Sequence, residues 1–575
     1  MHFPNDKLSS LKSYLSEISP EGRRMLLPAL HKAQELYGWL PEQVQIEIGK
    51  ALRVPLADIH GVVEFYTMFY NQPTAHRVIR VCQDSACWLA GCSEVAQALE
   101  EKLGLKPGET SSDGAITYEH VPCLGMCEVA PVALNGNQSA GHLTPDSVDD
   151  FLAGSHPAPP TKVYGHPAII TQNIGTKNPV TLDHYLNLGG YQGLRKAFNI
   201  RPELVMDAIE TTGILGRGGA MFPLGNKWRY TCHAPGGPAQ KHIIVNADES
   251  EPGTFKDRFL LEQDPFAVIE SATLAAYTIG AENGWIFVRG EYPGCYYQIH
   301  DSVCQARARG YLGRNILGQE GFNFDIQVYL GAGAYICGEE TALFEAIEGK
   351  RGFPRIKPPF PTTHGLFQQP TAINNVETLV AALKAWTIGV ENWNALGTPE
   401  SPGTKLFCLS GHVQNPGLYE FPFGITVRQL IEMGGGVPGD APIQAVLIGG
   451  AAGVFISPDK LDMPLTYEDA RAENVPLGSG VVMVFDETVD LRQVLYQLAR
   501  FFAHESCGKC YPCQLGTQRQ VEILERVDNG LINPETKEIL LDVGFTMTQT
   551  SLCGLGQTAA SAITSALKLW PELLE

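Results

Sequence analysis

The sequence predicts a multidomain α/β protein, on three observations. Its 575 residues exceed the length that usually folds around a single hydrophobic core. From about residue 165 onward, short apolar runs of strand type alternate with helical patterns, which is typical of α/β domains. A segment rich in proline and small residues, 154–161, separates this region from a smaller N-terminal region and suits an extended linker.

The N-terminal region divides into two parts. Residues 1–75 have a helical pattern, with one helix expected to open at Ser19 and Pro20 and to bury a leucine-rich face. Residues 76–155 predict strands at 78–81 and 118–121 and a helix from about Ser93 to Leu103. We place the linker itself at residues 156–164.

Three further parts are expected after the linker. Residues 165–402 form an α/β domain with candidate strands at 243–246, 285–288 and 325–329. Residues 403–490 have the pattern of a compact β-rich module with short helices. Residues 491–575 predict four helices.

Four cysteines near the C-terminus are the most informative motif. Cys507, Cys510 and Cys513 form a C-x2-C-x2-C triplet, and Cys553 follows later in the chain. Three thiolates this close can face one corner of a small inorganic cube while a distant fourth closes it, and this triplet is the commonest sequence form of a 4Fe–4S site. Tetrahedral zinc is the alternative, but it usually takes two C-x2-C pairs. The motif favours a 4Fe–4S cluster, which would make the chain an electron carrier.

A second set of cysteines lies in the N-terminal region. Cys82 and Cys87 form C-x4-C, Cys123 and Cys127 form C-x3-C, and each pair follows an apolar strand-like run. The unequal spacings fit a 2Fe–2S site better than a zinc knuckle. The alternative is four buried cysteines with no ligand role. We interpret the remaining cysteines as packed residues: Cys92, Cys232, Cys295, Cys304, Cys337 and Cys408.

Composition narrows the class of protein. Hydrophobic content of 44% and charged content of 18% are those of an ordinary globular protein. No apolar run reaches the length of a membrane span, and residues 1–7 lack secretory-signal features, so we expect a cytoplasmic chain. Its 14 cysteines should then be reduced and available to metals. A net charge of −20 argues against nucleic acid and anionic membranes as partners.

A glycine-rich loop at residues 213–223 is a candidate anion site. Its glycines let backbone N–H groups approach an anion, and Arg217 and Lys227 add positive charge. A phosphate cradle and a flexible surface loop both fit this pattern, which is neither a Walker A motif nor a Rossmann fingerprint.

Two other segments suit a nucleotide. Residues 246–258 follow a strand-like run and contain three acids within four residues, at 248–251, that could bind ribityl or ribose hydroxyls, although a solvated turn is favoured when the segment is taken alone. Residues 331–340 combine a glycine loop with two adjacent acids, and a basic stretch stiffened by proline extends to residue 361. Rings could stack there while cations meet phosphate and acids meet ribose.

Together these segments resemble one family closely. The glycine loop, residues 246–258, 335–361 and 374–378, and the cysteine triplet are similar to the flavin subunit of respiratory complex I. That resemblance covers about residues 165–575. Residues 1 to about 155 resemble its 2Fe–2S partner subunit, which has a thioredoxin-like fold. The chain departs from the family at Met221 and Leu224, where Gly and Thr are usual.

The resemblance implies a fold and an activity for each part. The N-terminal helices would precede a thioredoxin-like 2Fe–2S domain, the α/β domain would bind FMN and NADH, residues 403–490 would be a ubiquitin-like module, and the four-helix bundle would hold the 4Fe–4S cluster. Hydride would pass between NAD(H) and FMN, and single electrons would pass on through the clusters. No catalytic acid or base is implied.

The resemblance also implies the cofactor-binding residues. Those for the FMN phosphate and ribityl chain are Gly218, Gly219, Lys227, Asn246, Asp248, Asn374 and Asn375. Those for NADH are Tyr335, Glu340, Lys357 and Phe360, with Phe222 and Tyr230 near the adenine. Further candidates from the same segments are Gly216, Arg217, Glu249, Glu251, Gly338 and Glu339.

The presence of both parts in one chain bears on the partners. The single-chain form resembles the diaphorase subunit of soluble NAD-reducing nickel–iron hydrogenases and the flavin subunit of some NAD-dependent formate dehydrogenases. Residues 313–326 favour the hydrogenase over the formate dehydrogenase or a complex I entry module. Because the sequence shows no nickel–iron or molybdopterin site, we expect a hetero-oligomer with an iron–sulfur small subunit and a separate catalytic subunit. The alternative from another functional class is a scaffold protein whose cysteines bind zinc and which has no redox role.

Overall fold

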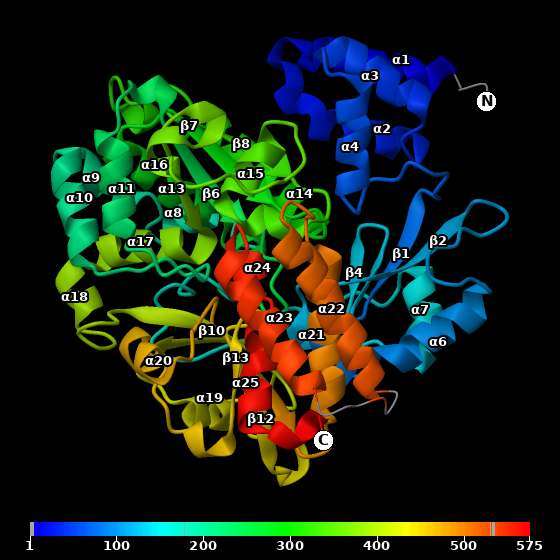
Figure 1. Cartoon of the computed structure of the whole chain (residues 1–575). Helices are drawn as coiled ribbons and strands as arrows, with labels where there is room; N and C mark the ends of the chain where they lie inside the picture. The colour runs from blue at the N-terminus through cyan, green and yellow to red at the C-terminus, as the bar shows by residue number, and fades with distance from the viewer. Residues whose placement is uncertain (1–4, 178, 529–530, 532–534, 575) are drawn as a thin grey trace.

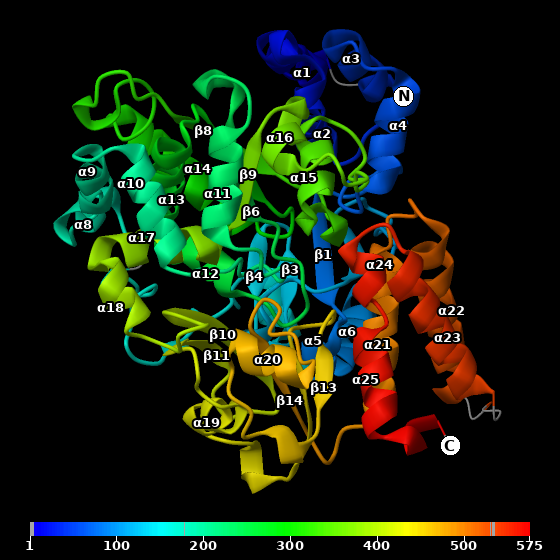
Figure 2. The same cartoon turned by 60° about the vertical axis from the view of Figure 1, so that its left-hand side comes forward.

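The computed structural model describes residues 5–177, 179–528, 531 and 535–574. Three sheets and two helical regions pack into one body, with the N-terminal helices at one side and the C-terminal helices beside them (Figures 1 and 2). Among the residues described, no helix is long and apolar enough to cross a membrane.

The N-terminal region contains helices α1 (Asn5–Ile18), α2 (Leu26–Tyr37), α3 (Glu42–Leu52) and α4 (Leu56–Phe65). The expected helix start at Ser19 and Pro20 is wrong, because these residues open a 3-10 segment and α2 begins only at Leu26. Gly22 explains the difference, since its φ of 64° and ψ of −144° interrupt the helical path. The leucine-rich face of α2 is buried as expected.

The next part has a four-stranded sheet in the order β2-β1-β3-β4. Its elements are β1 (Arg77–Cys82), α5 (Ser85–Leu89), α6 (Cys92–Leu103), β2 (Ile116–Val121), β3 (Ala133–Asn135), β4 (Gln138–Ala140) and α7 (Val148–Ala153). The two predicted strands and the predicted helix are confirmed. Cys92 is the first residue of α6 and is buried.

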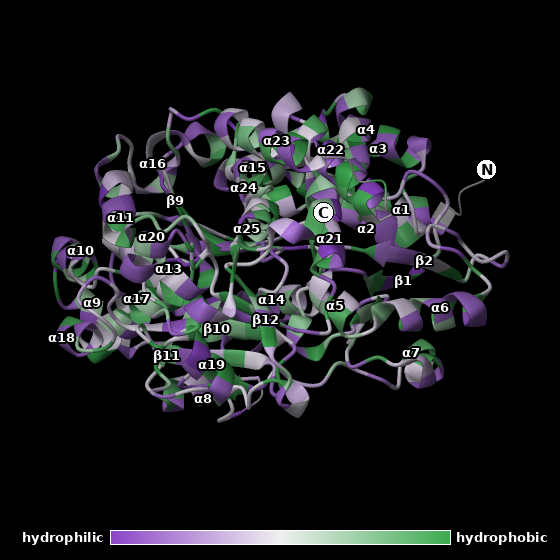
Figure 3. Cartoon of the chain, turned by 60° about the horizontal axis from the view of Figure 1, so that its bottom comes forward, coloured by the Kyte–Doolittle hydropathy of each residue, from purple (hydrophilic) through white to green (hydrophobic). Residues whose placement is uncertain are grey.

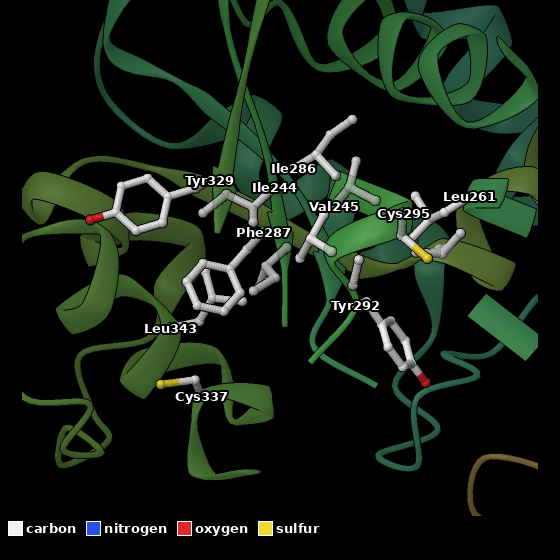
Figure 4. Packing of buried hydrophobic residues seen from close by; sticks show 14 of the residues in the cluster. Ile244, Val245, Leu261, Ile286, Phe287, Tyr292, Cys295, Tyr329, Cys337 and Leu343 are labelled. Carbon is white, nitrogen blue, oxygen red and sulfur yellow. The ribbon is translucent and has the colours of Figure 1, made fainter. Parts of the chain in front are cut away.

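The α/β domain is built on an all-parallel sheet in the order β8-β7-β6-β9. Its strands are β6 (His242–Ala247), β7 (Asn283–Val288), β8 (Asp325–Leu330) and β9 (Thr371–Asn375), so all three predicted strands are confirmed. Helices cover both faces, which leaves side chains such as Ile244, Val245 and Phe287 fully buried (Figure 4). The helices closest to the site are α11 (Leu224–His233), α12 (Lys256–Gln263), α15 (Glu340–Ile347), α16 (Pro361–His364) and α17 (Val376–Ile388).

The β-rich module contains a six-stranded sheet in the order β13-β12-β14-β10-β11-β5. Its own strands are β10 (Thr404–Gly411), β11 (Gly417–Pro422), β12 (Ile443–Ile448), β13 (Val454–Ile456) and β14 (Val481–Asp486), with helices α19 (Val427–Met433) and α20 (Tyr467–Glu473). Strand β5 (Val163–Tyr164) comes from the end of the expected linker and pairs with β11. The ring of Tyr164 stacks on Tyr419 at 4.7 Å, which gives this short strand a side-chain anchor.

The C-terminal region contains α21 (Leu491–Glu505), α22 (Tyr511–Asp528), α23 (Thr536–Thr550), α24 (Gly554–Thr558) and α25 (Ser561–Leu569). The fourth predicted helix is therefore split into α24 and α25. Along these helices apolar and polar residues alternate, as Figure 3 shows, and α21 buries its apolar face. The cysteine triplet lies at the junction of α21 and α22, and Cys553 is the residue before α24.

Candidate functional site

A cavity of about 610 Å³ opens at the carboxyl ends of β6 and β9. Asn246 lines it from the end of β6, and Asn374 and Asn375 line it from the end of β9. The first turns of α11 and α16 contribute Leu224, Lys227, Pro361 and Thr362. Ligands of α/β proteins bind at this edge of the sheet, because the helices that follow the strands begin there.

Thirteen of the nineteen predicted cofactor-binding residues line this cavity. They are Gly216, Gly218, Phe222, Lys227, Tyr230, Asn246, Gly338, Glu339, Glu340, Lys357, Phe360, Asn374 and Asn375. These residues come from segments up to about 160 positions apart in the chain, so the fold brings together what the sequence alone had grouped only by resemblance.

The inner wall has unsatisfied donors and close backbone. Asn374 is 5% exposed, and its Nδ2 has no hydrogen-bond partner among the described protein atoms. A Cβ added to Gly218 would lie 3.2 Å from the Cβ of Asn375, so glycine keeps this part of the wall open. Lys227 donates from Nζ to the Ile373 carbonyl at 2.9 Å, and burial lowers its pKa. The wall therefore offers an amide and an ammonium to a polar, anionic ligand.

The mouth of the cavity carries aromatic rings and an ion-pair cluster. Phe222, Tyr230 and Phe360 are among the large apolar side chains left exposed. Lys357 bridges the two adjacent acids, with Nζ at 2.9 Å from Glu339 and 2.6 Å from Glu340. Exposed rings beside mixed charges are what a nucleotide ligand requires.

Arg217 does not contribute positive charge to the cavity, and that expectation is wrong. Its side chain is 1% exposed and donates from Nη1 to Glu377 at 2.8 Å, with the rings of Trp393 and Phe423 at 5.6 and 5.8 Å. The backbone N–H of Arg217 donates to the Thr378 hydroxyl at 2.9 Å. The guanidinium therefore forms a buried ion pair beneath the loop and does not face the cavity.

Of the acids after β6, Glu249 is buried, and Asp248 and Glu251 are half-buried and accept hydrogen bonds from Ser250 and Tyr335, so the solvated-turn interpretation is also wrong. Glu249 accepts from the backbone N–H groups of Asp257 and Arg258, both at 2.8 Å, at the start of α12. Burial raises the pKa of Asp248 and of Glu249 to about 8 and that of Glu251 to about 7. None of the three lines the cavity. They form the layer behind it.

Tyr335 and Gly219 also lie outside the lining. The hydroxyl of Tyr335 donates to Glu251, and its backbone N–H donates to Glu505 at 2.9 Å. Gly219 has a φ of 115°, a conformation that glycine adopts readily, and lies between the lining residues Gly218 and Ala220.

The four C-terminal cysteines come together around a small cavity at the junction of α21, α22 and α24. Cys507, Cys510, Cys513 and Cys553 all line it, together with Ile336 and Pro354 of the α/β domain. Gly554, the residue after Cys553, lines the large cavity. The sequence prediction did not include Gly554 among the cofactor-binding residues. Its one sequence signal is its place directly after Cys553, a predicted cluster ligand.

The N-terminal cysteines also meet. Cys82, Cys87, Cys123 and Cys127 are all buried, and the Sγ atoms of Cys123 and Cys127 are 3.6 Å apart. Cys82 lies within hydrogen-bond reach of both Cys87 and Cys123. In the described part of the chain, no three histidine, cysteine or acidic side chains lie around one point in the way that a single metal ion requires. Each cysteine set is therefore a candidate cluster site because its four thiols are grouped together. A cluster needs just such a set of four thiolates spread around a body larger than one ion.

Comparison with known families covers most of the chain. Four family models match: thioredoxin-like [2Fe-2S] ferredoxin over residues 11–156, the Nuo51 FMN-binding domain over 209–384, the SLBB domain over 406–451, and the NADH-ubiquinone oxidoreductase-F iron-sulfur binding region over 493–575.

One relative covers nearly the whole chain, and another covers about two thirds of it. The NAD-reducing hydrogenase HoxS subunit alpha of Cupriavidus necator is 35% identical over 566 residues, which is 96% of this chain and 92% of the relative. The NADP-reducing hydrogenase subunit HndC of Solidesulfovibrio fructosivorans is 42% identical over 402 residues, covering 69% of this chain and 81% of the relative. The chain belongs to the family of flavin-binding NADH oxidoreductase subunits. A crystal structure of an H2-reduced NAD+-reducing [NiFe]-hydrogenase matches it with a TM-score of 0.86 and 32% identity, over 96% of this chain and 92% of that one.

Membership in this family fixes the activity and the cofactors. The chain is an NAD-dependent flavin and iron–sulfur oxidoreductase that carries electrons between NADH, FMN and iron–sulfur clusters and exchanges them with a partner subunit. Its cofactors are NAD(H), FMN, one 2Fe–2S cluster and one 4Fe–4S cluster. It works within a hetero-oligomeric complex.

Of the two departures from the expected pattern, Leu224 lines the cavity, and Met221 lies between the lining residues Ala220 and Phe222. Met221, where the family usually has Gly, adopts a φ of 50°. That left-handed conformation suits glycine and is uncommon for a long side chain, so the family pattern has a backbone reason. Leu224, where Thr is usual, is buried at the start of α11 and lines the cavity. The loop therefore carries some backbone strain at Met221.

Proposed function

We propose that this chain is the diaphorase subunit of an NAD-reducing nickel–iron hydrogenase, with the large cavity as its FMN and NADH site. One observation supports this most: the cavity that gathers the predicted cofactor residues also touches Gly554, beside the cysteine Cys553. A site for a two-electron carrier thus adjoins a site for a one-electron carrier. The hydrogenase is favoured because its relative matches nearly the full length of this chain as one polypeptide.

In this proposal the inner wall holds the flavin. Gly218 and Lys227 face the phosphate, and the side-chain amides of Asn246, Asn374 and Asn375 hold the ribityl chain. Asn374 has a buried Nδ2 free for this purpose. Bound FMN supplies the exchange between hydride chemistry and single-electron transfer. The protein positions it and excludes water, and no side chain is needed as an acid or base.

NADH is proposed to bind at the mouth. Phe222, Tyr230 and Phe360 offer ring faces to the adenine and nicotinamide, while Lys357 and Glu340 lie near the pyrophosphate and ribose. Asp248, Glu249, Glu251 and Tyr335 support this wall from behind without touching the ligand, which revises their role from ligand to support.

The partner is proposed to dock over the C-terminal helices. Tyr511 and Leu515 on α22 are 77% and 63% exposed, and Phe545 on α23 is 67% exposed. Tyr511 directly follows Cys510, so this apolar surface lies at the 4Fe–4S site. An iron–sulfur small subunit that joins this chain to a hydrogenase catalytic subunit fits such a surface. The free cysteines suit the reducing cytoplasm, where we place the complex.

A diaphorase assay tests the assignment. The purified full-length chain, reconstituted with FMN and both clusters, should be yellow-brown and should pass electrons from NADH to an artificial acceptor. Gly218→Val should lose most of its bound FMN and its activity, because the added side chain meets Asn375. A matched control, Gly294→Ala in α14 (Pro293–Ala308), should retain both, because nothing lies within 4 Å of the added Cβ and the backbone there is helical. Loaded wild-type protein that does not oxidise NADH would contradict the assignment.

We expect a strong preference for NADH over NADPH. If Glu340 lies near the adenosine ribose, the 2′-phosphate of NADPH places like charges together, and a cost of a few kcal/mol corresponds to roughly a hundredfold preference. Glu340→Gln should relax this preference in kcat/KM. Glu339→Gln is the matched control: Glu339 pairs with the same lysine but also caps α15 through Thr341 and Ala342, so it should lose stability while keeping the preference. Unchanged selectivity in Glu340→Gln would rule out this role.

A further inference from the structure

The hydroxyl of Ser506 lies at the cavity of the C-terminal cysteines. Ser506 is the residue between the end of α21 and Cys507, and it lines this cavity together with the four cysteines. Its Oγ is 3.3 Å from the Sγ of Cys513. A cysteine that binds a cluster is a thiolate and has no proton to give. With a cluster in place, the hydroxyl of Ser506 is therefore the donor and the sulfur of Cys513 is the acceptor.

The surrounding chain fixes this contact. Ser506 has a φ of −64° and a ψ of 117°, so it leaves the helical path of α21 before the loop that leads to α22. The residue before it, Glu505, accepts the backbone N–H of Tyr335 at 2.9 Å. Cys513 lies in the first turn of α22 and is 5% exposed. Because bulk water has little access to this sulfur, the hydroxyl supplies a polarity that solvent does not.

Cys513 differs from two of its neighbours in the kind of donor that it meets. The sulfur of Cys553 accepts from backbone N–H groups in the first turn of α24, and that of Cys507 accepts from a backbone N–H in its own loop. In the part of the chain that the structure describes, the donor to Cys513 is the side chain of Ser506. A side-chain donor can be removed by substitution while the backbone stays in place, so its contribution can be measured.

We propose that Ser506 is a positioning residue for electron transfer: its hydroxyl donates to the Cys513 thiolate and raises the midpoint potential of the 4Fe–4S cluster. The inference rests on the placement of that cluster at these four cysteines. Reduction adds one electron, supplied by the flavin, and the hydroxyl keeps its proton. The added negative charge is shared by the sulfurs, so a donor to one sulfur stabilises the reduced form more than the oxidised form. The cluster thereby becomes a better acceptor for electrons from the flavin.

Ser506 is better suited to this role than two other polar residues nearby. Lys509 lines the same cavity, but it is exposed, with its Nζ 5.2 Å from the centre of the Phe353 ring, and water and salt screen its charge. Ser551 is 6% exposed and its Oγ has no partner among the described protein atoms. It is not one of the described residues that line the cavity. Ser551 therefore serves as a matched control, a buried hydroxyl of the same region without the contact to a cysteine.

The test is a redox titration of the 4Fe–4S signal in electron paramagnetic resonance, on the full chain loaded with FMN and both clusters. Ser506→Ala should lower the equilibrium constant for one-electron reduction about tenfold, which corresponds to a midpoint about 59 mV more negative. Ser551→Ala should leave the midpoint where it is in wild type. Iron and acid-labile sulfide are measured in each variant, so that only protein with equal cluster content is compared.

A second pair of variants separates the hydroxyl from the shape of the side chain. Threonine and valine are nearly the same in shape, and the extended backbone at position 506 accommodates both. Ser506→Thr should keep the midpoint near that of wild type, whereas Ser506→Val should shift it as Ser506→Ala does. This pair also keeps the test valid if Ser506→Ala does not hold its cluster.

The outcomes distinguish failure of the inference from failure of the cluster placement. Equal midpoints in wild type and Ser506→Ala, or in Ser506→Thr and Ser506→Val, would overturn the role of the hydroxyl. A shift in Ser551→Ala as large as that in Ser506→Ala would assign the effect to loosened packing and overturn it as well. If Cys553→Ser kept the 4Fe–4S signal unchanged, the placement of the cluster would be wrong, and the inference would fall with it.

Discussion

Replacement of Cys510 by serine should abolish electron delivery from NADH to the partner subunit while leaving flavin reduction by NADH largely intact. The four C-terminal cysteines surround one small cavity, and Cys510 lies next to the exposed apolar surface of α22. Loss of one thiolate should remove or disable the 4Fe–4S cluster. The flavin site is lined by other residues, with Gly554 as its contact from this helical region, and should survive.

The informative comparison is Cys87→Ser in the other cysteine set. By the family pattern the 2Fe–2S cluster is a store for one electron beside the main route, so this variant should lose a 2Fe–2S signal and keep much of the overall turnover. Turnover is measured per intact complex after size-exclusion chromatography, so that loss of the cluster is distinguished from loss of assembly. If intact Cys87→Ser complex loses NAD-linked turnover as completely as Cys510→Ser, the 2Fe–2S cluster lies on the path.

The sequence predicts best what depends on short-range pattern. Strands β6 and β7 contain continuous apolar runs, as parallel strands covered on both faces must, whereas the edge strand β8 begins with alternating polar and apolar residues; in each case the position can be inferred from the residues themselves. The two cysteine sets are similar in this respect, because ligand spacing within each pair or triplet is a local constraint. Only the meeting of the distant pairs depended on the fold.

The errors concern charged residues whose partners lie far away in the chain. Arg217 in a glycine loop has the local pattern of a phosphate ligand, but its partner Glu377 is 160 positions away. Asp248, Glu249 and Glu251 have the local pattern of a solvated turn, but the fold packs them behind the cavity, with Glu249 buried and the other two half-buried. Whether a charge faces solvent, a ligand or another charge is decided by tertiary packing, which a local pattern does not record.

Glu377 should be the most sensitive charged residue for stability. Its carboxylate is fully buried and lies 2.8 Å from Arg217, 3.3 Å from Lys256 and 3.4 Å from Lys405. Lys405 belongs to β10 of the β-rich module, whereas Glu377 lies in the first turn of α17 of the α/β domain. Asn375 and Thr378, close to Glu377 in the chain, line the cavity. This ion-pair cluster therefore joins two domains directly beneath the proposed flavin site.

We expect Glu377→Gln to lower the free energy of unfolding by about 3–5 kcal/mol, because glutamine keeps the shape but leaves the cations without their carboxylate. Burial alone would raise the pKa of Glu377, but Lys405, Lys256 and Arg217 bring it down to about 2 from 4.5. The carboxylate therefore stabilises the fold fully above about pH 4.5, and this contribution is lost as the pH falls toward 2. Denaturant unfolding of wild type and variant should show a gap that is constant near neutral pH and narrows in acid.

A second substitution identifies the cause of the loss. Burial lowers the pKa of Lys405 to about 8, so keeping this side chain charged in the folded protein costs free energy. Lys405→Met combined with Glu377→Gln removes one uncompensated cation and should recover part of the lost stability. A merely steric role for Glu377 predicts no recovery, since methionine restores no contact to glutamine. The cluster also holds Asn375 through Lys256 at 3.3 Å, so FMN affinity should fall in Glu377→Gln and rise again in the double variant. Stability that recovers without FMN affinity would show that the ion pairs join the domains but do not position the cavity wall.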